Sequence, residues 1–201
     1  MNYTEIKDAA ISFSMRTDSE TASHVDTFLR MVEARLDRLL SIRILMNRAV
    51  LSLIEGTSYY ATPADMLSIR DIQVNRDGVM ITPVYVNPET MNNNMSGASD
   101  ELVYTFINNQ IQINPVFHGD QMEVVYMQRV PNLTAAEPNN VIAKAAPDVY
   151  IFGLLVEICA FAKDTASSEM WNQRFKGAVA ELQAEDDKSR WSGPSLRIRL
   201  G

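Results

Sequence analysis

The sequence predicts an α+β protein: a helical bundle formed by N-terminal and C-terminal helices, with an inserted antiparallel β-module and an extended C-terminal tail. Three observations carry this prediction. Apolar residues recur at helical spacing near both ends of the chain, while the middle is β-rich and broken by turn residues. Helices at both ends can pack as one bundle around a shared core. We expect the boundaries to fall at residues 1–43, 44–131, 132–188 and 189–201.

The N-terminal segment predicts two helices. Residues 3–15 form a short one, and Thr17-x-x-Glu20 fits a capping box for the next. Apolar residues then follow at i, i+3, i+4, i+7, i+11, i+14 and i+15, namely Val25, Phe28, Leu29, Val32, Leu36, Leu39 and Leu40. This spacing is typical of an amphipathic helix, and we expect it to end near residues 41–43.

The middle of the chain predicts five to seven short antiparallel strands. Asn75-Arg76-Asp77-Gly78 has the composition of a hairpin turn, and Asn108-Asn109 separates two further short strands. Residues 87–101 are polar and low in complexity, which is typical of a mobile surface loop.

The C-terminal segment predicts a short helix at 139–145 and longer helices at 148–163 and 167–187. Pro147 suits the first turn of a helix, where its missing N–H costs nothing. The last helix places five apolar residues on one face, Trp171, Phe175, Ala178, Val179 and Leu182. Gly153 and Gly177 lie inside helices, where glycine costs about 1 kcal/mol relative to alanine, so we expect close helix–helix approach at both.

The helix at 148–163 is apolar on nearly every side and must be covered by something. Its longest apolar stretch, from Tyr150 to Ala162, has 13 residues and contains Glu157, which is too short and too polar to cross a bilayer. The N-terminus carries acidic residues and no apolar signal-peptide region, so we expect synthesis in the cytoplasm and no membrane association. Neighbouring helices of the same bundle are the expected cover.

No residue pattern predicts catalysis, a metal site or a cofactor. Cys159 is a lone cysteine within an apolar helix and is expected to pack as a small hydrophobic residue. His24 and His118 lack ligand-like partners and are expected at the surface. The sequence contains no GxSxG, P-loop, GxGxxG or HExxH motif. These features favour a structural or interaction role over an enzyme.

The charge distribution argues against tight nucleic-acid binding. The formal charge of −7 is concentrated in residues 44–140, which hold four basic and ten acidic residues. Because nucleic-acid affinity depends on Lys and Arg neutralising phosphates, such a protein should not hold DNA firmly. An acidic wall could still let DNA slide past it.

The C-terminal tail has its own pattern. From Lys188 onward it is basic and contains no acidic residue, and Ser192-Gly193-Pro194 prevents the helix from continuing. Leu196, Ile198 and Leu200 alternate with Arg197 and Arg199, which is the period of an extended strand. A solvated, frayed end is one interpretation. A segment that becomes ordered on a partner, for example by adding a strand to a sheet edge, fits this composition better.

Four segments, in order, resemble the head-to-tail adaptor proteins of tailed bacteriophages. Phe28 to Arg38 follows an F-L-x-x-x-E-A-R-L-x-R pattern, and Tyr60 to Arg70 follows Y-x-x-P-x-D-F/M-L-x-I-R. Residues 129–164 are similar to R-x-P-x-L…N-x-L…A-P-D-L-Y-L-Y-G-x-L-x-E-A, and residues 171–182 to W-x-x-R-Y-x-x-A-x-x-x-L. Val141-Ile142 stands where Trp-Leu is often found. The resemblance spans almost the whole chain and is weakest over 84–125.

The resemblance implies a structural virion protein at the head–tail interface. Such a protein would form a ring of twelve subunits beneath the portal protein, extend the DNA channel and receive tail or nozzle proteins. Double-stranded DNA would pass through the lumen without sequence-specific binding. The resemblance also implies that the C-terminal segment docks onto the portal, for which we expect the residues Arg190, Trp191, Leu196, Arg197, Ile198 and Arg199. An adjacent ring subunit would then cover the part of helix 148–163 that its own bundle leaves exposed.

Two other functions compete with this one. A tail nozzle or tail-completion protein would meet the adaptor instead of the portal. A cell-wall-degrading virion enzyme would need paired carboxylates or a metal cluster, and the sequence offers neither pattern. The acidic β-module could face either the tail or the channel, and the sequence does not choose between them.

Overall fold

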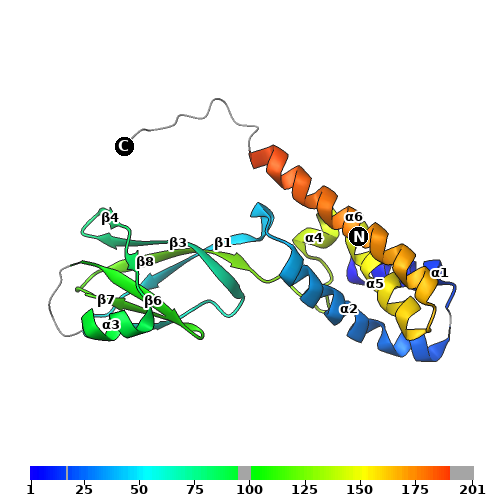
Figure 1. The fold of residues 1–201 in the computed structure, drawn as a ribbon, viewed down its shortest axis with the longest axis horizontal. Coiled ribbons are helices and arrows are strands. Elements are labelled where there is room, and N and C mark those ends of the chain that lie inside the picture. Colours follow the sequence, from blue (N-terminus) through cyan, green and yellow to red (C-terminus); the bar gives the residue numbers. More distant parts are fainter. Residues whose placement is uncertain (17, 95–100, 191–201) are drawn as a thin grey trace. The chain divides into compact units, whose positions relative to one another are not determined.

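The computed structural model describes residues 1–16, 18–94 and 101–190, together with their side chains except those of 92–94 and Arg190. Its α+β composition confirms the predicted fold class. The chain divides into two compact units, one comprising Met1–Ile44 with the described residues from Val130 onward, the other Leu45–Arg129 (Figure 1).

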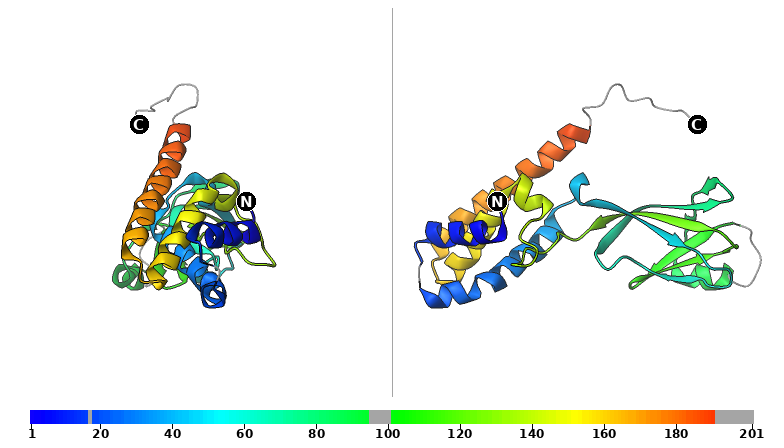
Figure 2. Two further views of the ribbon diagram at one scale, coloured as in Figure 1. Left: turned by 90° about the vertical axis from the view of Figure 1, so that its right-hand side faces the viewer. Right: turned by 180° about the vertical axis from the view of Figure 1, so that it is seen from behind.

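The first unit is a helical bundle built around one apolar helix. Its helices are α1 (Tyr3–Ser14), α2 (Ser19–Leu39), α4 (Val141–Ala145), α5 (Pro147–Phe161) and α6 (Thr165–Arg190). The further views show α5 surrounded by α1, α2 and α6, each of which packs against it (Figure 2). Nine residues of α5 are buried, namely Val149, Tyr150, Ile151, Gly153, Leu154, Leu155, Val156, Ile158 and Cys159. Within the described chain, the bundle therefore covers most of α5.

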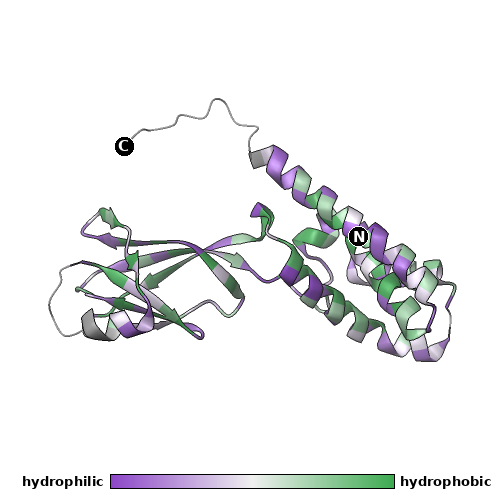
Figure 3. Cartoon of the chain, in the orientation of Figure 1, coloured by the Kyte–Doolittle hydropathy of each residue, from purple (hydrophilic) through white to green (hydrophobic). Residues whose placement is uncertain are grey.

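The expected apolar faces pack against α5. Ile6 and Ala10 of α1 and Phe175 of α6 are fully buried. The residues of α2 at the predicted spacing are also buried, namely Val25, Phe28, Leu29, Val32 and Leu36. Figure 3 shows the corresponding colouring, with hydrophobic residues along α5 and hydrophilic ones on the outer turns of α6. Leu39 departs from the prediction: it is exposed, and α2 ends there, before the expected 41–43.

The start of α2 corrects one expected cap. The N-cap is Asp18, whose side chain accepts a hydrogen bond from the amide of Thr21, so the cap falls one residue after Thr17. Thr17 itself lies outside the described residues. Asp18 is as good a capping residue as threonine and also brings negative charge to the positive end of the helix dipole. A capping box does occur at α1, between Asn2 and Glu5.

The two helical glycines differ. A Cβ at Gly153 would lie 2.7 Å from Val32 Cγ1 and 3.2 Å from Phe175 Cε2, so α2 and α6 both approach α5 closely there, as expected. A Cβ at Gly177 would meet nothing within 4 Å among the described residues, so the prediction of close approach is wrong at this position.

The second unit is a sandwich of two four-stranded sheets. The sheet orders are β1-β8-β3-β4 and β2-β7-β6-β5, and every pair is antiparallel except the short β5/β6 pair. The strands are β1 (Met46–Ser52), β2 (Tyr59–Ala61), β3 (Met66–Arg76), β4 (Val79–Ile81), β5 (Val84–Tyr85), β6 (Val103–Ile107), β7 (Gln110–Asn114) and β8 (Gln121–Gln128). This exceeds the five to seven strands predicted, because β4 and β5 have only three and two residues and leave little trace in the sequence.

Both predicted turns are present. Asp77 and Gly78 have positive φ of 52° and 84° between β3 and β4, and Asn108 has φ of 54° between β6 and β7. At Asp77-Gly78, both central residues have the positive φ that the twist of a two-residue hairpin favours. Inward-facing residues of both sheets then form one core, including Ile72, Val74, Ile111, Ile113, Met122 and Val124.

The segment predicted as a loop contains a helix. Residues Pro88–Asn94 form α3, where Asn87 accepts a hydrogen bond from the amide of Thr90 and Met91 is fully buried. Proline in the first turn and an asparagine cap both favour this helix. Met91 is one buried apolar residue among polar neighbours, so a count of polar residues overlooks it. Residues 95–100 of the expected loop lie outside the described residues.

Candidate functional site

The described residues bring no group of candidate metal ligands together, and the single cysteine is buried. No three His, Cys, Asp or Glu side chains within 1–16, 18–94 and 101–190 come together as metal ligands could. Cys159 is buried, and that burial raises the pKa of its thiol, which opposes the nucleophilic thiolate form. His24 and His118 are exposed, as expected. No described helix is long and apolar enough to span a bilayer.

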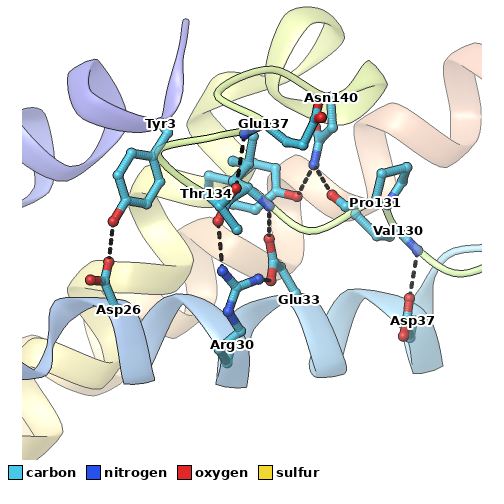
Figure 4. A network of polar contacts seen from close by, with 12 residues as sticks. Tyr3, Asp26, Arg30, Glu33, Asp37, Val130, Pro131, Thr134, Glu137 and Asn140 are labelled. Atoms are coloured by element: carbon cyan, nitrogen blue, oxygen red, sulfur yellow. Dashed lines mark hydrogen bonds and ion pairs between the residues drawn. The ribbon is translucent and has the colours of Figure 1, made fainter.

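A polar network ties α2 to the segment Val130–Asn140 that returns to the bundle (Figure 4). Glu33 Oε1 accepts a hydrogen bond of 2.6 Å from the Leu133 amide, and Arg30 Nη2 donates one of 2.8 Å to the Leu133 carbonyl. One turn further along α2, Asp37 Oδ1 accepts a hydrogen bond of 2.7 Å from the Val130 amide. Successive turns of one helix thus bind the backbone of a segment about a hundred residues away.

Asn140 fixes the other end of this return segment. Its Nδ2 donates to the Pro131 carbonyl at 2.6 Å and to the Tyr150 hydroxyl at 2.7 Å, while its Oδ1 accepts from the Ala143 amide and caps α4. Tyr150 is fully buried, and burial raises the pKa of its hydroxyl well above the ordinary value. The hydroxyl therefore stays protonated and available as a hydrogen-bonding group in the core.

The electrostatics of the network centre on Glu33. Its side chain is almost completely buried beside Arg30, which completes an ion pair with it. Burial raises the pKa of Glu33 against the opposing effects of the Leu133 amide and Arg30. This carboxylate is more simply a structural anchor than a catalytic group, because each of its oxygens already accepts a hydrogen bond within the fold.

A second set of contacts binds the C-terminal half of α6 to the segment that follows α2. Gln183 Nε2 donates to the Leu39 carbonyl at 2.7 Å. Arg43 places its backbone amide and its Nε each 3.1 Å from Asp186 Oδ1, and its Nη2 also contacts Ser189 Oγ. The last turns of α6 are therefore fastened to the bundle nearly to the helix end.

The expected portal-docking residues begin at Arg190, directly after Ser189, the last residue of α6 whose described side chain contacts Arg43. Arg190 is the last residue of α6, and the structure describes its backbone only. Trp191, Leu196, Arg197, Ile198 and Arg199 lie outside the described residues, so their grouping into one binding surface stays a prediction. α6 is longer than the predicted 167–187, and it includes Ser189 and Arg190, the first two residues of the segment predicted as an extended tail.

A groove of about 460 Å³ lies beside the same end of α6. It is lined by Ile42, Arg43, Ile44, Ala145, Leu182, Glu185, Asp186 and Ser189. These residues come from α4, α6 and the segment after α2, which are far apart in the sequence, and no motif identified them beforehand.

Other surfaces are also exposed. β1 lies at the edge of its sheet, paired on one side with β8, and its side chains are largely exposed. At the end of the bundle where α1 ends and α6 begins, Phe13, Met15 and Met170 are exposed around a smaller pocket. Scattered exposed apolar residues are normal, so these two surfaces identify no particular partner.

Comparison with known protein families gives a match over almost the whole chain. The family model described as SU10 adaptor protein matches residues 1–199. No curated protein matches the chain.

Proposed function

Because the chain belongs to the SU10 adaptor protein family, a family of phage head-to-tail adaptors, we propose that it forms a ring beneath the portal protein. The ring would extend the DNA channel and provide the attachment surface for the tail or nozzle proteins. The observation that carries this proposal is the family match over 1–199, which includes both the bundle and most of the tail. The protein would be made in the host cytoplasm and incorporated into the virion.

The proposed mechanism is physical. A ring of identical subunits uses two different patches on each subunit, repeated around an axis until the ring closes. We propose twelve subunits, with the exposed end of α5 at Phe161 covered by a neighbouring subunit. Residues 44–140 carry most of the net negative charge, which would repel DNA phosphates and let the DNA pass without binding.

The tail is the proposed portal-docking element. Arg190, Trp191, Leu196, Arg197, Ile198 and Arg199 combine cations, an aromatic residue and alternating aliphatic residues. Trp and Arg are enriched among residues that dominate binding energy at interfaces. A segment that takes its docked conformation only on the portal would let subunits stay apart until the portal is present.

Deleting residues 191–201 tests the docking assignment. We expect the deletion to abolish co-purification with the portal protein of the same phage while leaving the circular dichroism spectrum unchanged. The deletion starts after Ser189, because that residue contacts Arg43 within the bundle. A full-length Arg197→Glu/Arg199→Glu variant should weaken binding in the same assay. Arg174→Glu/Lys176→Glu, at two exposed positions of α6, is the matched charge control and should bind normally.

Normal portal binding by the deleted protein would refute the docking assignment. Cryo-electron microscopy of the particle separates the adaptor from a nozzle or tail-completion protein, since only an adaptor contacts the portal. A cell-wall zymogram in which the purified protein clears its substrate would contradict the proposal that it is not an enzyme.

A further inference from the structure

The groove beside the end of α6 has an apolar floor, an Arg43–Asp186 ion pair in its lining and the carboxylate of Glu185 at its margin. Ile42 is 2% exposed and Ala145 and Leu182 lie beside it, whereas Ile44 is 46% exposed. Glu185 lines the groove and is exposed, and Glu181 is exposed one turn earlier on α6. Residues four apart lie on the same side of a helix, so both carboxylates face the same surroundings. The groove therefore suits a segment that combines aliphatic and cationic side chains.

The tail of the same chain has this composition. Leu196, Ile198 and Leu200 are three alternating aliphatic residues, and in an extended segment their side chains share one side. Arg197 and Arg199 lie between them, and their long side chains can reach acids at a groove margin while their stems cover apolar surface. The tail contains no acidic residue that would repel Glu185.

The tail is also attached at the right place. Ser189 lines the groove, and the tail follows Arg190. Leu182 lies eight residues before Arg190, about 12 Å along the helix at 1.5 Å per residue. Eleven tail residues can span about 36 Å when extended, so residues 196–200 can reach back over this distance. Ser192-Gly193-Pro194 supplies the turn residues that a reversal of direction requires.

We propose that residues 196–200 occupy this groove on their own subunit in the free protein. The aliphatic side chains lie on Ile42, Ile44 and Leu182, and the arginines lie beside Glu185. A short flexible connection gives an effective concentration of about 1 mM, which exceeds that of a second copy at micromolar protein concentrations. The complementarity between the groove and residues 196–200 does not depend on the proposed docking of the tail onto a portal protein. If the tail also docks onto a portal, then docking must first release it from the groove.

A disulfide trap tests the inference in the full-length chain. Ile44→Cys/Ile198→Cys in a Cys159→Ser background should form a disulfide within one chain, at a rate independent of protein concentration. The matched control is Ala184→Cys/Ile198→Cys, because Ala184 is exposed on α6 and lies outside the groove. It lies six residues before Arg190, about 9 Å along α6. Eight extended residues span about 29 Å, so an unheld tail reaches Ala184, and only a held tail favours the groove pair.

The groove pair should therefore react roughly tenfold faster or more than the control pair. Equal rates for the two pairs would overturn the proposal. Cross-linking only between chains would also overturn it, because the groove would then hold the tail of another copy.

Limited trypsin digestion gives a second measurement that needs no added cysteine. In the unmodified chain, cleavage after Arg197 and Arg199 should be slow. Leu182→Glu, which places a charge on the groove floor, should speed it roughly threefold or more if cleavage tracks the released population. Ala184→Glu adds the same charge at an exposed position outside the groove and should leave the rate unchanged. Equal cleavage in all three folded proteins would contradict a held tail.

Discussion

Glu33 is a buried carboxylate whose stability contribution depends on pH. Burial raises its pKa above the ordinary value of 4.5, so the folded protein holds this proton at higher pH than the unfolded chain does. Stability contributed by Glu33 should therefore be greatest below pH 4.5 and fall as the pH rises through the folded-state pKa.

Two substitutions at Glu33 separate its charge from its hydrogen bond. Glu33→Gln keeps an acceptor for the Leu133 amide, removes a buried charge and loses a half-exposed ion pair with Arg30. We expect its free energy of unfolding to stay within about 1 kcal/mol of the original protein. Glu33→Ala leaves a buried amide unpaired and should cost about 1–3 kcal/mol.

Urea denaturation at several pH values between 4.5 and 7 measures both effects. The glutamine variant should also lose the pH dependence that Glu33 causes. An alanine variant as stable as the glutamine variant would show that the Leu133 hydrogen bond contributes nothing.

At the scale of the element, the two helical glycines provide a matched pair. Gly153→Ala should destabilise the bundle by about 1–3 kcal/mol, because its Cβ would lie 2.7 Å from Val32 Cγ1 in a close-packed region. Gly177→Ala should stabilise α6 by about 0.5–1 kcal/mol, because nothing described lies within 4 Å and alanine favours helix. Thermal unfolding of both variants tests this, and a shift of the same sign in both would contradict it.

Elements also differ in how well the sequence predicts them. The apolar face of α2 and the turn at Asp77-Gly78 were predictable, because both depend on residues close together in the sequence. α3 was not, since its anchor is one methionine, Met91, among polar residues. Asp18 replaced Thr17 as the cap of α2, which is a choice between two adjacent residues of similar capping strength.

At the scale of the whole molecule, we propose that the β-module, predicted as 44–131, is an independently folding domain. The core formed by both sheets consists only of residues between Leu45 and Arg129. Its first and last strands are neighbours, with Met46 paired to Met127, so the chain enters and leaves at one place. An insertion of this kind disturbs its host little when its ends lie close together.

A fragment of residues 45–129 tests this domain proposal. We expect it to unfold cooperatively in urea and to give dispersed amide resonances, because it retains its complete core. A matched variant, Ile113→Ala, removes a fully buried side chain from that core and should lower the unfolding midpoint. A fragment without a cooperative transition would show that the module needs the bundle to fold.

The two proposed binding surfaces also differ in whether they depend on neighbouring or on distant residues of the sequence. The tail was noticeable in the sequence because its alternation of aliphatic and cationic residues is local. The groove beside the end of α6 was not noticeable in the sequence, since Ile44, Ala145 and Leu182 come from three separated parts of the chain. Likewise, nothing near Glu33 in the sequence indicates that its partner is the amide of Leu133.

By itself, the sequence determined the α+β class, the faces of the helices, the hairpin turns and the resemblance to phage adaptors, because periodicity, turn chemistry and motifs are local properties of the chain. The tertiary structure decided the order of the strands in two sheets, the close approach at Gly153 but not at Gly177, and the hydrogen bonds of Glu33. These features depend on which distant residues meet. Packing and the pairing of buried polar groups determine which distant residues meet, and the sequence of a single segment does not reveal those contacts.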